Sequence, residues 1–524
     1  MKIKSLIILI IKKQRLILFI LVISYLLLFS YLSFAQHDGL KTQMNDLGNM
    51  DQPIFNTTRG RLMQASNCYN CGQPIINRLG GHANFIFLFF VPIYAIFPNP
   101  KVLLFTQTLL IALGSFPLYW IGRRFFGEKS WISLIGPLIY LLNPMVQDVN
   151  LYDFHATSVA MPLIIFAFYF LYIKQDRLFY LFSILVVIAK EDMALIIFMM
   201  GLFIMLYQRE IKRGLFVSLA SLLYFFLVNE LLMPLFLGGM NHPVITQRYS
   251  YLGDNVFKIL INLITHPLSF MAYLFTPEKT VYLVALLFPV IFLPVFSLEV
   301  LALSLPSVLI NLLSSFSMMY YPFQYYYMAP ILAFIFLATI FSLYKIYKNK
   351  RILLGTVTFS LLVTTFTISF LASPAPYSLV SSWREFKVDE HAKRISRVKE
   401  RIDSEASLSA QNNPGAHFSQ RSLVYTFPLK AHESDFVFLD VNDPFEITRT
   451  FPRNRSFEFI TQMFLSDYKK EIISMFEDPN YGVYYFSEDG YLLFKKGVLK
   501  DKNKDAQKMF EKQLEQIATL DVDS

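Results

Sequence analysis

A polar loop at residues 36–84, after the first apolar stretch, carries side chains of the types needed for group transfer. It contains Asp46 and Asp51, five residues apart, together with Arg61 and His82. A carboxylate can remove the proton from an acceptor hydroxyl, and a cation can stabilise a departing phosphate. We therefore take Asp46 as the candidate general base with Asp51 in support, and Arg61 and His82 as candidate phosphate ligands. The alternative for the two aspartates is an ordinary turn or capping role.

Further ionisable side chains interrupt the apolar stretches that follow the loop. They are Asp148, Asp153, His155, Lys190, Glu191 and Asp192. Three ionisable residues in succession between apolar runs, as at 190–192, are costly at membrane depth and usually functional. We place Asp153 among the catalytic candidates, His155 and Lys190 among the phosphate ligands, and Asp148, Glu191 and Asp192 in supporting positions. Two alternatives stay open: Asp153 could cap a helix that begins near residue 157, and Lys190 could belong to a solvated connector.

The composition identifies the class of protein that must position these groups. Of the 524 residues, 55% are hydrophobic and only 16% are charged. Runs such as 16–35 and 216–236 reach the roughly 20 apolar residues that cross a bilayer. The net charge of +9 is explained by basic residues in short cytoplasmic loops, not by nucleic-acid binding. The sequence predicts a polytopic α-helical membrane protein.

The distribution of basic residues sets the predicted topology. If the short run 85–97 lies at the interface, Arg123 and Arg124 fall in the cytoplasm, as the positive-inside rule requires. The pattern then gives about eleven transmembrane helices, with the N-terminus cytoplasmic and the C-terminus outside. All the candidate residues above share the extracytoplasmic side. The first run, ending near Ala35, resembles a cleavable signal peptide, but its length favours an uncleaved anchor.

A change of composition after Pro376 divides the chain into two predicted domains. Residues 1–375 form the transmembrane domain, with the long outer loop 36–84, and residues 376–524 form an extracytoplasmic soluble domain of α/β or α+β type. Apolar residues at helical spacing predict an amphipathic helix over 387–406. Strand-like runs at 483–486 and 492–494 flank a turn and predict a hairpin.

Several motifs resemble a prokaryotic family of predicted membrane proteins known only as a domain of unknown function. They are Asp46-Leu47-Gly48, Asp51-Gln52, Asn56, Gly60, Gly81-His82, Arg123-Arg124, Asp153-Phe154-His155 and Lys190-Glu191-Asp192, with Ser407–Ala410, His417-Phe418-Ser419, Arg421, Tyr425 to Pro428 and Phe436–Asp440 in the C-terminal part. That family is grouped with the GT-C glycosyltransferases. The resemblance implies a GT-C-like membrane domain, a lipid-linked sugar donor and two acidic sites. The first would be Asp46 or Asp51, and the second Asp148 or Asp153.

The predicted function is that of a membrane glycosyltransferase (a hexosyltransferase) at the extracytoplasmic face. It would transfer a sugar from a polyprenyl-phosphate donor to a glycan, lipid or protein acceptor. A pyrophosphate donor would instead call for a divalent metal, Mg or Mn, held by carboxylates. The alternatives are a transporter or flippase for a lipid-linked or small solute, and an inactive GT-C-like scaffold. Cys68 and Cys71 lie in the outer loop, where a local disulfide is expected.

Overall fold

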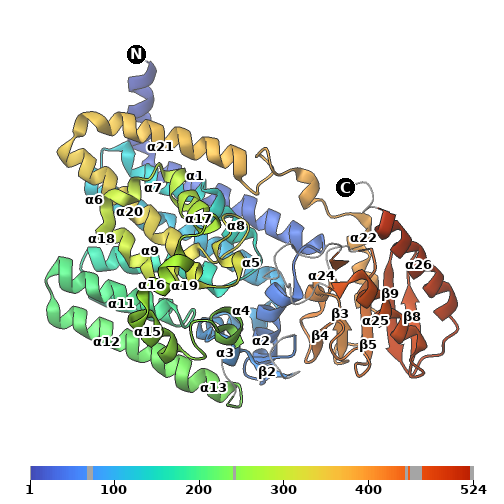
Figure 1. Cartoon of the computed structure of the whole chain (residues 1–524). Coiled ribbons are helices and arrows are strands. Elements are labelled where there is room, and N and C mark those ends of the chain that lie inside the picture. The colour runs from blue at the N-terminus through green and yellow to red at the C-terminus, as the bar shows by residue number, and fades with distance from the viewer. Residues whose placement is uncertain (1, 68–74, 240–242, 443–446, 449–462, 520–524) are drawn as a thin grey trace. The chain divides into compact units, whose positions relative to one another are not determined.

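The chain forms two compact units, each assembled from segments that are distant in sequence. A computed structural model describes residues 2–67, 75–239, 243–442, 447–448 and 463–519 (Figure 1). The first unit contains Met1–Phe34, His82–Phe87 and Leu104–Phe386, and the second contains Ala35–Gly81, Leu88–Leu103 and Lys387–Ser524. Most of the loop that holds Asp46, Asp51 and Arg61 therefore belongs with the C-terminal residues, whereas His82 belongs with the helices.

Long apolar helices make up most of the first unit. Six helical stretches in the described ranges are long and apolar enough to cross a bilayer, or seven if a helix pair bent by 47° counts as one span. The six are Lys12–Asp38 within α1 (Lys2–Asp38), Pro100–Phe126 formed by α5 (Pro100–Leu113) and α6 (Ser115–Phe126), Ile211–Phe236 beginning with α12 (Ile211–Leu227), Leu293–Leu313 ending with α19 (Leu305–Leu313), α20 (Ala329–Asn349) and α21 (Arg351–Ala372). The bent pair is Trp131–Leu141, which includes α7 (Ile135–Leu141), followed by α8 (Pro144–Leu151). The predicted class of a polytopic α-helical membrane protein is confirmed.

Fewer helices reach spanning length than the about eleven that the sequence predicts. Four of the segments assigned to spans form shorter helices, which are α9 (Ala156–Tyr172), α10 (Asp176–Val187), α11 (Met193–Phe203) and α17 (Pro277–Leu287). The longest, α9, has 17 residues, or roughly 26 Å at the helical rise, against a hydrocarbon core of about 30 Å. The run 85–97 forms only short helices, η2 (Phe85–Phe89) and α4 (Val91–Ile96), and its interfacial placement stays a prediction.

Close packing in the first unit depends on small residues where helices meet. Helix α20 packs against α6, α9 and α21, and its residues from Ala329 to Ala338 are all buried. Helices α11 and α12 approach each other closely at Gly201 and Gly214. A Cβ atom on Gly201 would lie 2.3 Å from Ser218 Oγ and 2.9 Å from the backbone oxygen of Gly214. These two helices can therefore pack at this distance only with glycine at position 201.

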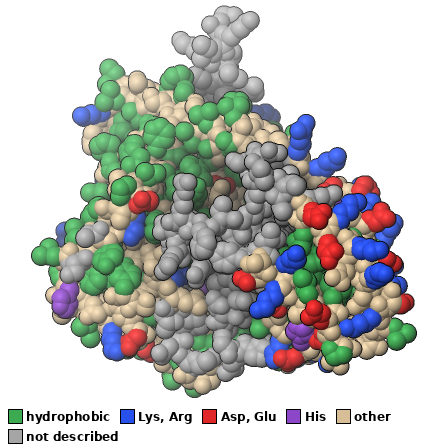
Figure 2. Space-filling view, turned by 45° about the vertical axis from the view of Figure 1, so that its right-hand side comes forward, with side chains coloured by type: hydrophobic (Ala, Val, Ile, Leu, Met, Phe, Trp, Pro, Cys, Tyr) green, Lys and Arg blue, Asp and Glu red, His purple; other side chains and the backbone are tan. Residues whose placement is uncertain are grey.

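The C-terminal residues of the second unit form a five-stranded mixed sheet of order β4-β3-β5-β9-β8. Strand β3 pairs in parallel with β4 and β5, and β9 pairs antiparallel with β5 and β8. The strands are β3 (Leu408–Ala410), β4 (Val424–Thr426), β5 (Phe436–Asp440), β8 (Tyr481–Phe486) and β9 (Tyr491–Lys496). The predicted hairpin corresponds to β8 and β9. In Figure 2, the surface over these strands carries mixed charges, whereas the surface over the first unit's helices is largely hydrophobic.

Both faces of this sheet are buried, because alternate residues of β5 enter different cores. Val437 and Leu439 pack in one hydrophobic cluster with residues of α25 (Leu465–Glu477) and α26 (Asn503–Thr519). Phe436 and Phe438 pack in the other, with residues of α22 (Glu390–Lys393) and α23 (Ile395–Lys399). The amphipathic pattern at 387–406 is confirmed, since its apolar residues Ala392, Ile395, Val398 and Ile402 all lie in this core. The helix itself is broken into α22 and α23.

The first polar loop completes the second of these two cores. Leu40 and Met44 pack among its residues, and the loop's own elements are η1 (Met44–Gly48), α2 (Asn49–Thr58), β1 (Gln64–Ala65), β2 (Ile76–Asn77) and α3 (Arg78–Gly81). The Asn45 amide donates to Asn412 Oδ1 at 2.9 Å, and Ser66 Oγ donates to the Val424 carbonyl at 2.8 Å. These bonds pair polar groups of the loop with the ends of β3 and β4.

We predict that Gly201→Val will destabilise the helical unit by about 1–3 kcal/mol, because the added side chain must displace Ser218 and the backbone of α12. The matched control is Gly355→Ala, where a Cβ atom meets nothing within 4 Å. Thermal unfolding in detergent should show a lower Tm for the valine variant and an unchanged or higher Tm for the control. Equal Tm values for both variants would contradict the packing described here.

Candidate functional site

The connector between α10 and α11 carries three of the candidate residues and is fixed by the segment that begins at His82. The Glu191 carboxylate is bound at both oxygens, by His82 Nδ1 at 2.7 Å and by the Ala83 backbone amide at 3.1 Å. The Asn84 side chain donates to the Ala189 carbonyl at 2.8 Å. His82 is therefore the ion-pair partner of Glu191, and this contact helps to hold the connector that carries Lys190 and Asp192.

Lys190 and Asp192 form an ion pair of 3.2 Å on this connector, with both side chains mostly buried. Burial disfavours the charged ammonium, but the carboxylates of Asp192 and Glu191 outweigh it and raise the pKa of Lys190. Burial also raises the pKa of the Asp192 carboxyl, against the opposing effect of Lys190. Lys190 thus carries a positive charge in a largely dry environment, where it can bind an anion more strongly than it could in water.

Arg248 supplies a second cation beside Lys190. Its positive charge acts to lower the pKa of Lys190, because two like charges repel each other. It lies at the end of α14 (Pro243–Arg248). Its guanidinium lies 4.5 Å from the ring centre of Phe316 and 5.5 Å from that of Tyr327, and donates at 3.5 Å to the Tyr327 hydroxyl. No carboxylate in the described ranges forms an ion pair with Arg248. Aromatic faces and a hydroxyl leave most of this cation's hydrogen-bonding capacity for an anionic ligand.

A row of tyrosines connects Arg248 with His155. The His155 ring is buried and stacks on Tyr326 at a centroid distance of 3.6 Å, and Tyr326 lies 4.3 Å from Tyr327. Tyr152 lies against Tyr326 at 5.6 Å. His155, Tyr326, Tyr327 and Arg248 thus form a continuous row of side chains within the helical unit, and Lys190 lies near enough for its charge to interact with that of Arg248. We call this set, with Asp192, the cation–tyrosine cluster.

The Asp153–His155 turn is fixed by one buried glutamine. Gln107 Nε2 donates to the Asp153 carbonyl at 2.6 Å, and Gln107 Oε1 accepts from the His155 amide at 2.9 Å. Asp153 adopts a left-handed backbone conformation with φ 43°, an uncommon one for a non-glycine residue. The residue that caps α9 is His155, with no side-chain cap bond, so the alternative that Asp153 caps this helix is wrong.

Asp148 serves the same region from α8. The Gln324 backbone lies close enough to interact with the Asp148 carboxylate, and Asp148 is 8% exposed. Gln324 and the preceding Phe323 both have left-handed φ angles, 73° and 66°. Two such residues in succession cost free energy and need external support. Asp148 therefore supports the turn that presents Tyr325 and Tyr326 to His155.

Asp51, in the second unit, has a buried carboxylate and no exposed surface. Tyr94 donates a hydrogen bond to one of its oxygens, and Ser419 Oγ donates to the other at 2.7 Å. Gln420 Nε2 in turn donates to the Tyr94 hydroxyl at 2.7 Å. Burial raises the pKa of the Asp51 carboxyl to about 6, although both hydrogen bonds act in the opposite direction. With both oxygens occupied, Asp51 joins three segments of the second unit.

The other two candidates on the first loop differ in exposure and in partners. Asp46 lies in η1 and is partly exposed, so its carboxylate can meet an acceptor. Arg61 donates from Nε and Nη2 to Asn56 Oδ1, at 3.2 and 2.9 Å. This bidentate contact gives Arg61 a part in closing its own loop. The expected pair Cys68 and Cys71 lies outside the described residues.

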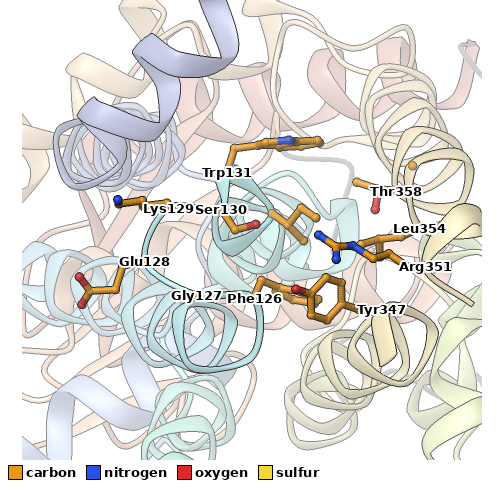
Figure 3. A pocket seen from close by; sticks show the side chains of 12 residues that line it. Phe126, Gly127, Glu128, Lys129, Ser130, Trp131, Tyr347, Arg351, Leu354 and Thr358 are labelled. Carbon is orange, nitrogen blue, oxygen red and sulfur yellow. The ribbon is translucent and has the colours of Figure 1, made fainter. Parts of the chain in front are cut away.

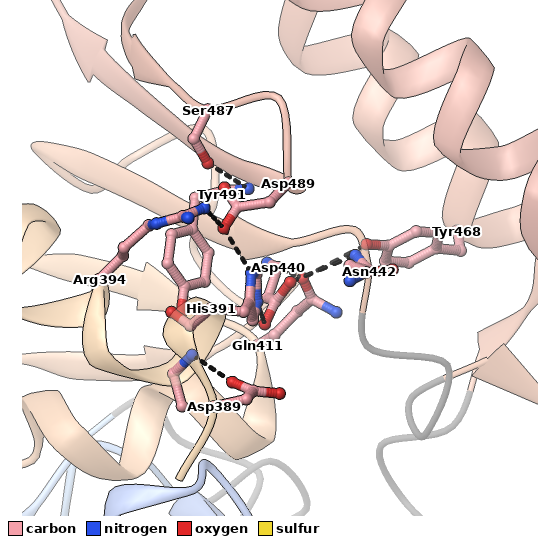
Figure 4. A network of polar contacts seen from close by, with 11 residues as sticks. Asp389, His391, Arg394, Gln411, Asp440, Asn442, Tyr468, Ser487, Asp489 and Tyr491 are labelled. Atoms are coloured by element: carbon pink, nitrogen blue, oxygen red, sulfur yellow. Dashed lines mark hydrogen bonds and ion pairs between the residues drawn. The ribbon is translucent and has the colours of Figure 1, made fainter.

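A separate polar network occupies the C-terminal sheet (Figure 4). His391 bonds to Asp440 at 2.8 Å and to Asp489 at 3.0 Å, and Arg394 also bonds to Asp489. The two carboxylates raise the pKa of His391 to about 9 in spite of its burial. This network ties α22 and α23 to β5 and to the β8–β9 turn. Within the described ranges, no group of three or more His, Cys, Asp or Glu side chains could hold a metal ion, so an Mg or Mn requirement stays a prediction.

Sequence reasoning missed Arg248 and the role of the tyrosines. Arg248 stands in a segment that the topology places outside, where basic residues are disfavoured. This exception to the positive-inside rule is the sequence feature that could have identified Arg248 as a functional residue. In the sequence, Tyr325, Tyr326 and Tyr327 are typical of an aromatic belt at the membrane interface or of a sugar-stacking surface, and no sequence pattern connects them with His155.

The pKa of Asp51 predicts a pH dependence of stability. In the unfolded chain this carboxyl has a pKa of about 4, and in the folded chain about 6. Between these values the folded state binds more protons, so the free energy of unfolding decreases as the pH rises, and the loss is complete above about pH 6. Two pKa units correspond to about 3 kcal/mol. Asp51→Asn, which keeps the shape but cannot ionise, should lack this decrease.

Thermal unfolding in detergent from pH 4 to pH 7 measures this effect. Wild type should lose Tm across the window relative to Asp51→Asn, and the exposed control Asp505→Asn should keep the wild-type slope. Parallel profiles for wild type and Asp51→Asn would show that this carboxyl is not buried as described.

Comparison with known proteins gives the chain's family. A search of curated proteins finds no match. Among matching solved structures, the crystal structure of ArnT from Cupriavidus metallidurans bound to undecaprenyl phosphate has 11% sequence identity and a TM-score of 0.48, and the match covers 91% of this chain and 97% of that chain. A family model described as "Predicted membrane protein (DUF2079)" matches residues 36–473. The predicted resemblance is thereby confirmed, and the chain belongs to the DUF2079 family of predicted membrane proteins.

Proposed function

We propose that this protein is a GT-C-type membrane glycosyltransferase that takes a hexose from a polyprenyl-phosphate donor. The observation that carries the proposal is the Arg248 guanidinium, which lies beside Lys190 and has no carboxylate partner in the described ranges. Arg248 is partly buried, and a cation withdrawn from water without a counter-ion costs free energy unless an anionic ligand compensates it. The phosphate of a lipid carrier has the charge and the membrane location that this position calls for.

The cation–tyrosine cluster contains the groups that a departing phosphate needs. Arg248 offers a planar set of donors suited to phosphate oxygens, and Lys190 adds a point charge. His155 lies at the other end of the tyrosine row and is a third candidate ligand. In an inverting transfer, the acceptor oxygen forms a bond to the anomeric carbon while the bond from that carbon to the phosphate oxygen breaks. The electron pair leaves with the polyprenyl phosphate, whose charge these cations stabilise.

The general base is proposed among the carboxylates predicted from the sequence. Asp46 is partly exposed, whereas both oxygens of Asp51 accept hydrogen bonds in a buried position. Asp46 is therefore the preferred base, with Asp153 as the catalytic candidate of the helical unit. The proposed topology places the N-terminus in the cytoplasm and the reaction at the extracytoplasmic face. A glycan, a lipid or a protein could be the acceptor.

We predict that Arg248→Met will weaken binding of polyprenyl phosphate about 10- to 100-fold, because a charge-assisted hydrogen bond contributes about 1.5–3 kcal/mol. Arg248→Lys should recover part of the affinity. The control is Lys258→Met, which removes an exposed lysine that pairs with Asp254. Lys258 lies on the same predicted side of the membrane as Arg248. Binding of labelled polyprenyl phosphate to protein in nanodiscs is measured alongside sugar release from the glycosylated carrier. Equal affinity in Arg248→Met and wild type would show that Arg248 does not bind the carrier phosphate. Movement of the carrier across the bilayer without cleavage of its sugar would indicate a transporter.

We predict that Asp46→Asn will reduce sugar transfer by at least about 100-fold, in the range typical of a lost general base. Donor binding should stay within twofold of wild type, since the variant keeps the size and hydrogen-bonding shape of the side chain. Asp153→Asn, measured in parallel, tests the other candidate. Normal transfer by Asp46→Asn together with loss of transfer by Asp153→Asn would move the base to the helical unit.

A further inference from the structure

A polar cavity lies elsewhere in the helical unit, where the α6–α7 connector meets the turn between α20 and α21 (Figure 3). It has a volume of about 600 Å³, within the range of small-molecule sites. Its lining is formed by the connector residues 126–132, by Tyr347 and by Arg351, Leu354, Gly355 and Thr358 of α21. None of the residues proposed for sugar transfer belongs to this lining.

The cavity is separated from the cation–tyrosine cluster by the whole length of α20. Tyr326 and Tyr327 immediately precede that helix, whereas Tyr347 belongs to its last turns. At 1.5 Å per residue, the 21 residues of α20 extend over about 30 Å. Basic residues are concentrated at the cavity end, at Arg123 and Arg124 and again at Lys348 and Lys350. The positive-inside rule therefore assigns the cavity to the cytoplasmic boundary of the membrane.

The charged groups of the lining favour an anion. Glu128, the one acidic lining residue, forms an ion pair with Arg123. Figure 3 shows the Glu128 and Lys129 side chains directed away from Arg351, whose guanidinium points toward Ser130. The guanidinium stacks on Tyr347, 5.2 Å from its ring centre. Arg351 forms no ion pair with any carboxylate of the described chain, so its donors remain for a ligand.

A buried hydroxyl on the same face of α21 lacks a hydrogen-bond partner. Thr358 is 1% exposed, and its Oγ1 has no hydrogen-bond partner in the part of the chain described here. A buried hydroxyl without a partner costs about 1–3 kcal/mol. A ligand that carries several acceptor oxygens could bind both the Arg351 guanidinium and the hydroxyl groups of Ser130 and Thr358.

The surroundings of the cavity suit a lipid. Residues 351, 354, 355 and 358 share one face of α21 by their spacing. The adjacent face carries large exposed apolar side chains at positions 352, 359, 363, 366 and 370. Gly355 lies between the two faces, and a Cβ atom added there would meet no neighbouring atom within 4 Å. Trp131 and Tyr347 are of the types that concentrate where hydrocarbon meets headgroups. A headgroup in the cavity would leave its acyl chains along the apolar face of α21.

We propose that this cavity is a binding site for the phosphodiester headgroup of an anionic phospholipid in the cytoplasmic leaflet. The phosphate oxygens accept from Arg351, Ser130 and Thr358, and the acyl chains follow α21. Basic pockets between transmembrane helices on this side of a membrane bind such headgroups in other proteins. The site is independent of sugar transfer, and its failure would leave the proposed function untouched.

Native mass spectrometry of the purified full-length protein tests this proposal. Titration with phosphatidylglycerol should show one tightly retained lipid, bound at least about tenfold more strongly than phosphatidylcholine. Gly355→Leu fills the cavity without backbone strain, and Arg351→Gln removes the charge. Each should weaken phosphatidylglycerol binding about tenfold or more. Thr356→Leu, on the exposed face of the same helix, and Lys350→Gln, beside Arg351, are the matched controls and should bind as wild type does.

Three results would overturn the proposal. The first is unchanged retention of phosphatidylglycerol in both Gly355→Leu and Arg351→Gln. The second is equal weakening in the Thr356→Leu and Lys350→Gln controls. The third is displacement of the bound lipid by millimolar inorganic phosphate, which would show that the cavity binds a small anion. Because the two site variants change α21 in different ways, misfolding of one leaves the other as a test.

Discussion

Pairing of buried ionisable groups is the constraint on which this structure depends. A carboxylate removed from water must receive hydrogen bonds or lose its charge. Asp51 meets this requirement through Tyr94 and Ser419, and Glu191 through His82 and the Ala83 amide. Each of these contacts joins segments that are far apart in the chain. The polar groups thus determine which segments must meet, and the apolar residues fill the space between them.

Arg248 departs from this rule, which is why it draws attention as a functional group. Its partners are aromatic rings, a thioether and a hydroxyl. Neighbouring structure is organised to keep it and Lys190 in place. Gln107 fixes the turn before α9, and Asp148 supports the turn before α20. Several polar side chains of the helical unit, such as Gln107 and Asp148, therefore act as positioning residues and not as catalytic ones.

The sequence predicted the membrane class, the family and many secondary-structure elements, because these follow from local patterns. Helical spacing identified the apolar face that became α22 and α23, and the turn at residue 489 predicted the β8–β9 hairpin. Partners distant along the chain were not predictable. Asp51 receives its hydrogen bonds from residues 43 and 368 positions away, and no local pattern encodes such separations. Fewer helices than predicted reach spanning length in the described residues, since apolar content alone does not fix where a helix ends.

The composition of the second unit has a consequence for biosynthesis. The segment Ala35–Gly81 leaves the ribosome long before Ser419. Ser419 lies 338 residues after Gly81. At a translation rate of roughly 5–20 residues per second, this interval lasts about 20 to 70 s. During that time Asp51 lacks one of its two hydrogen-bond donors, and the apolar side chains of Leu40 and Met44 lack the core that later covers them. The nascent chain must therefore keep an early segment soluble while most of the helices are still being inserted.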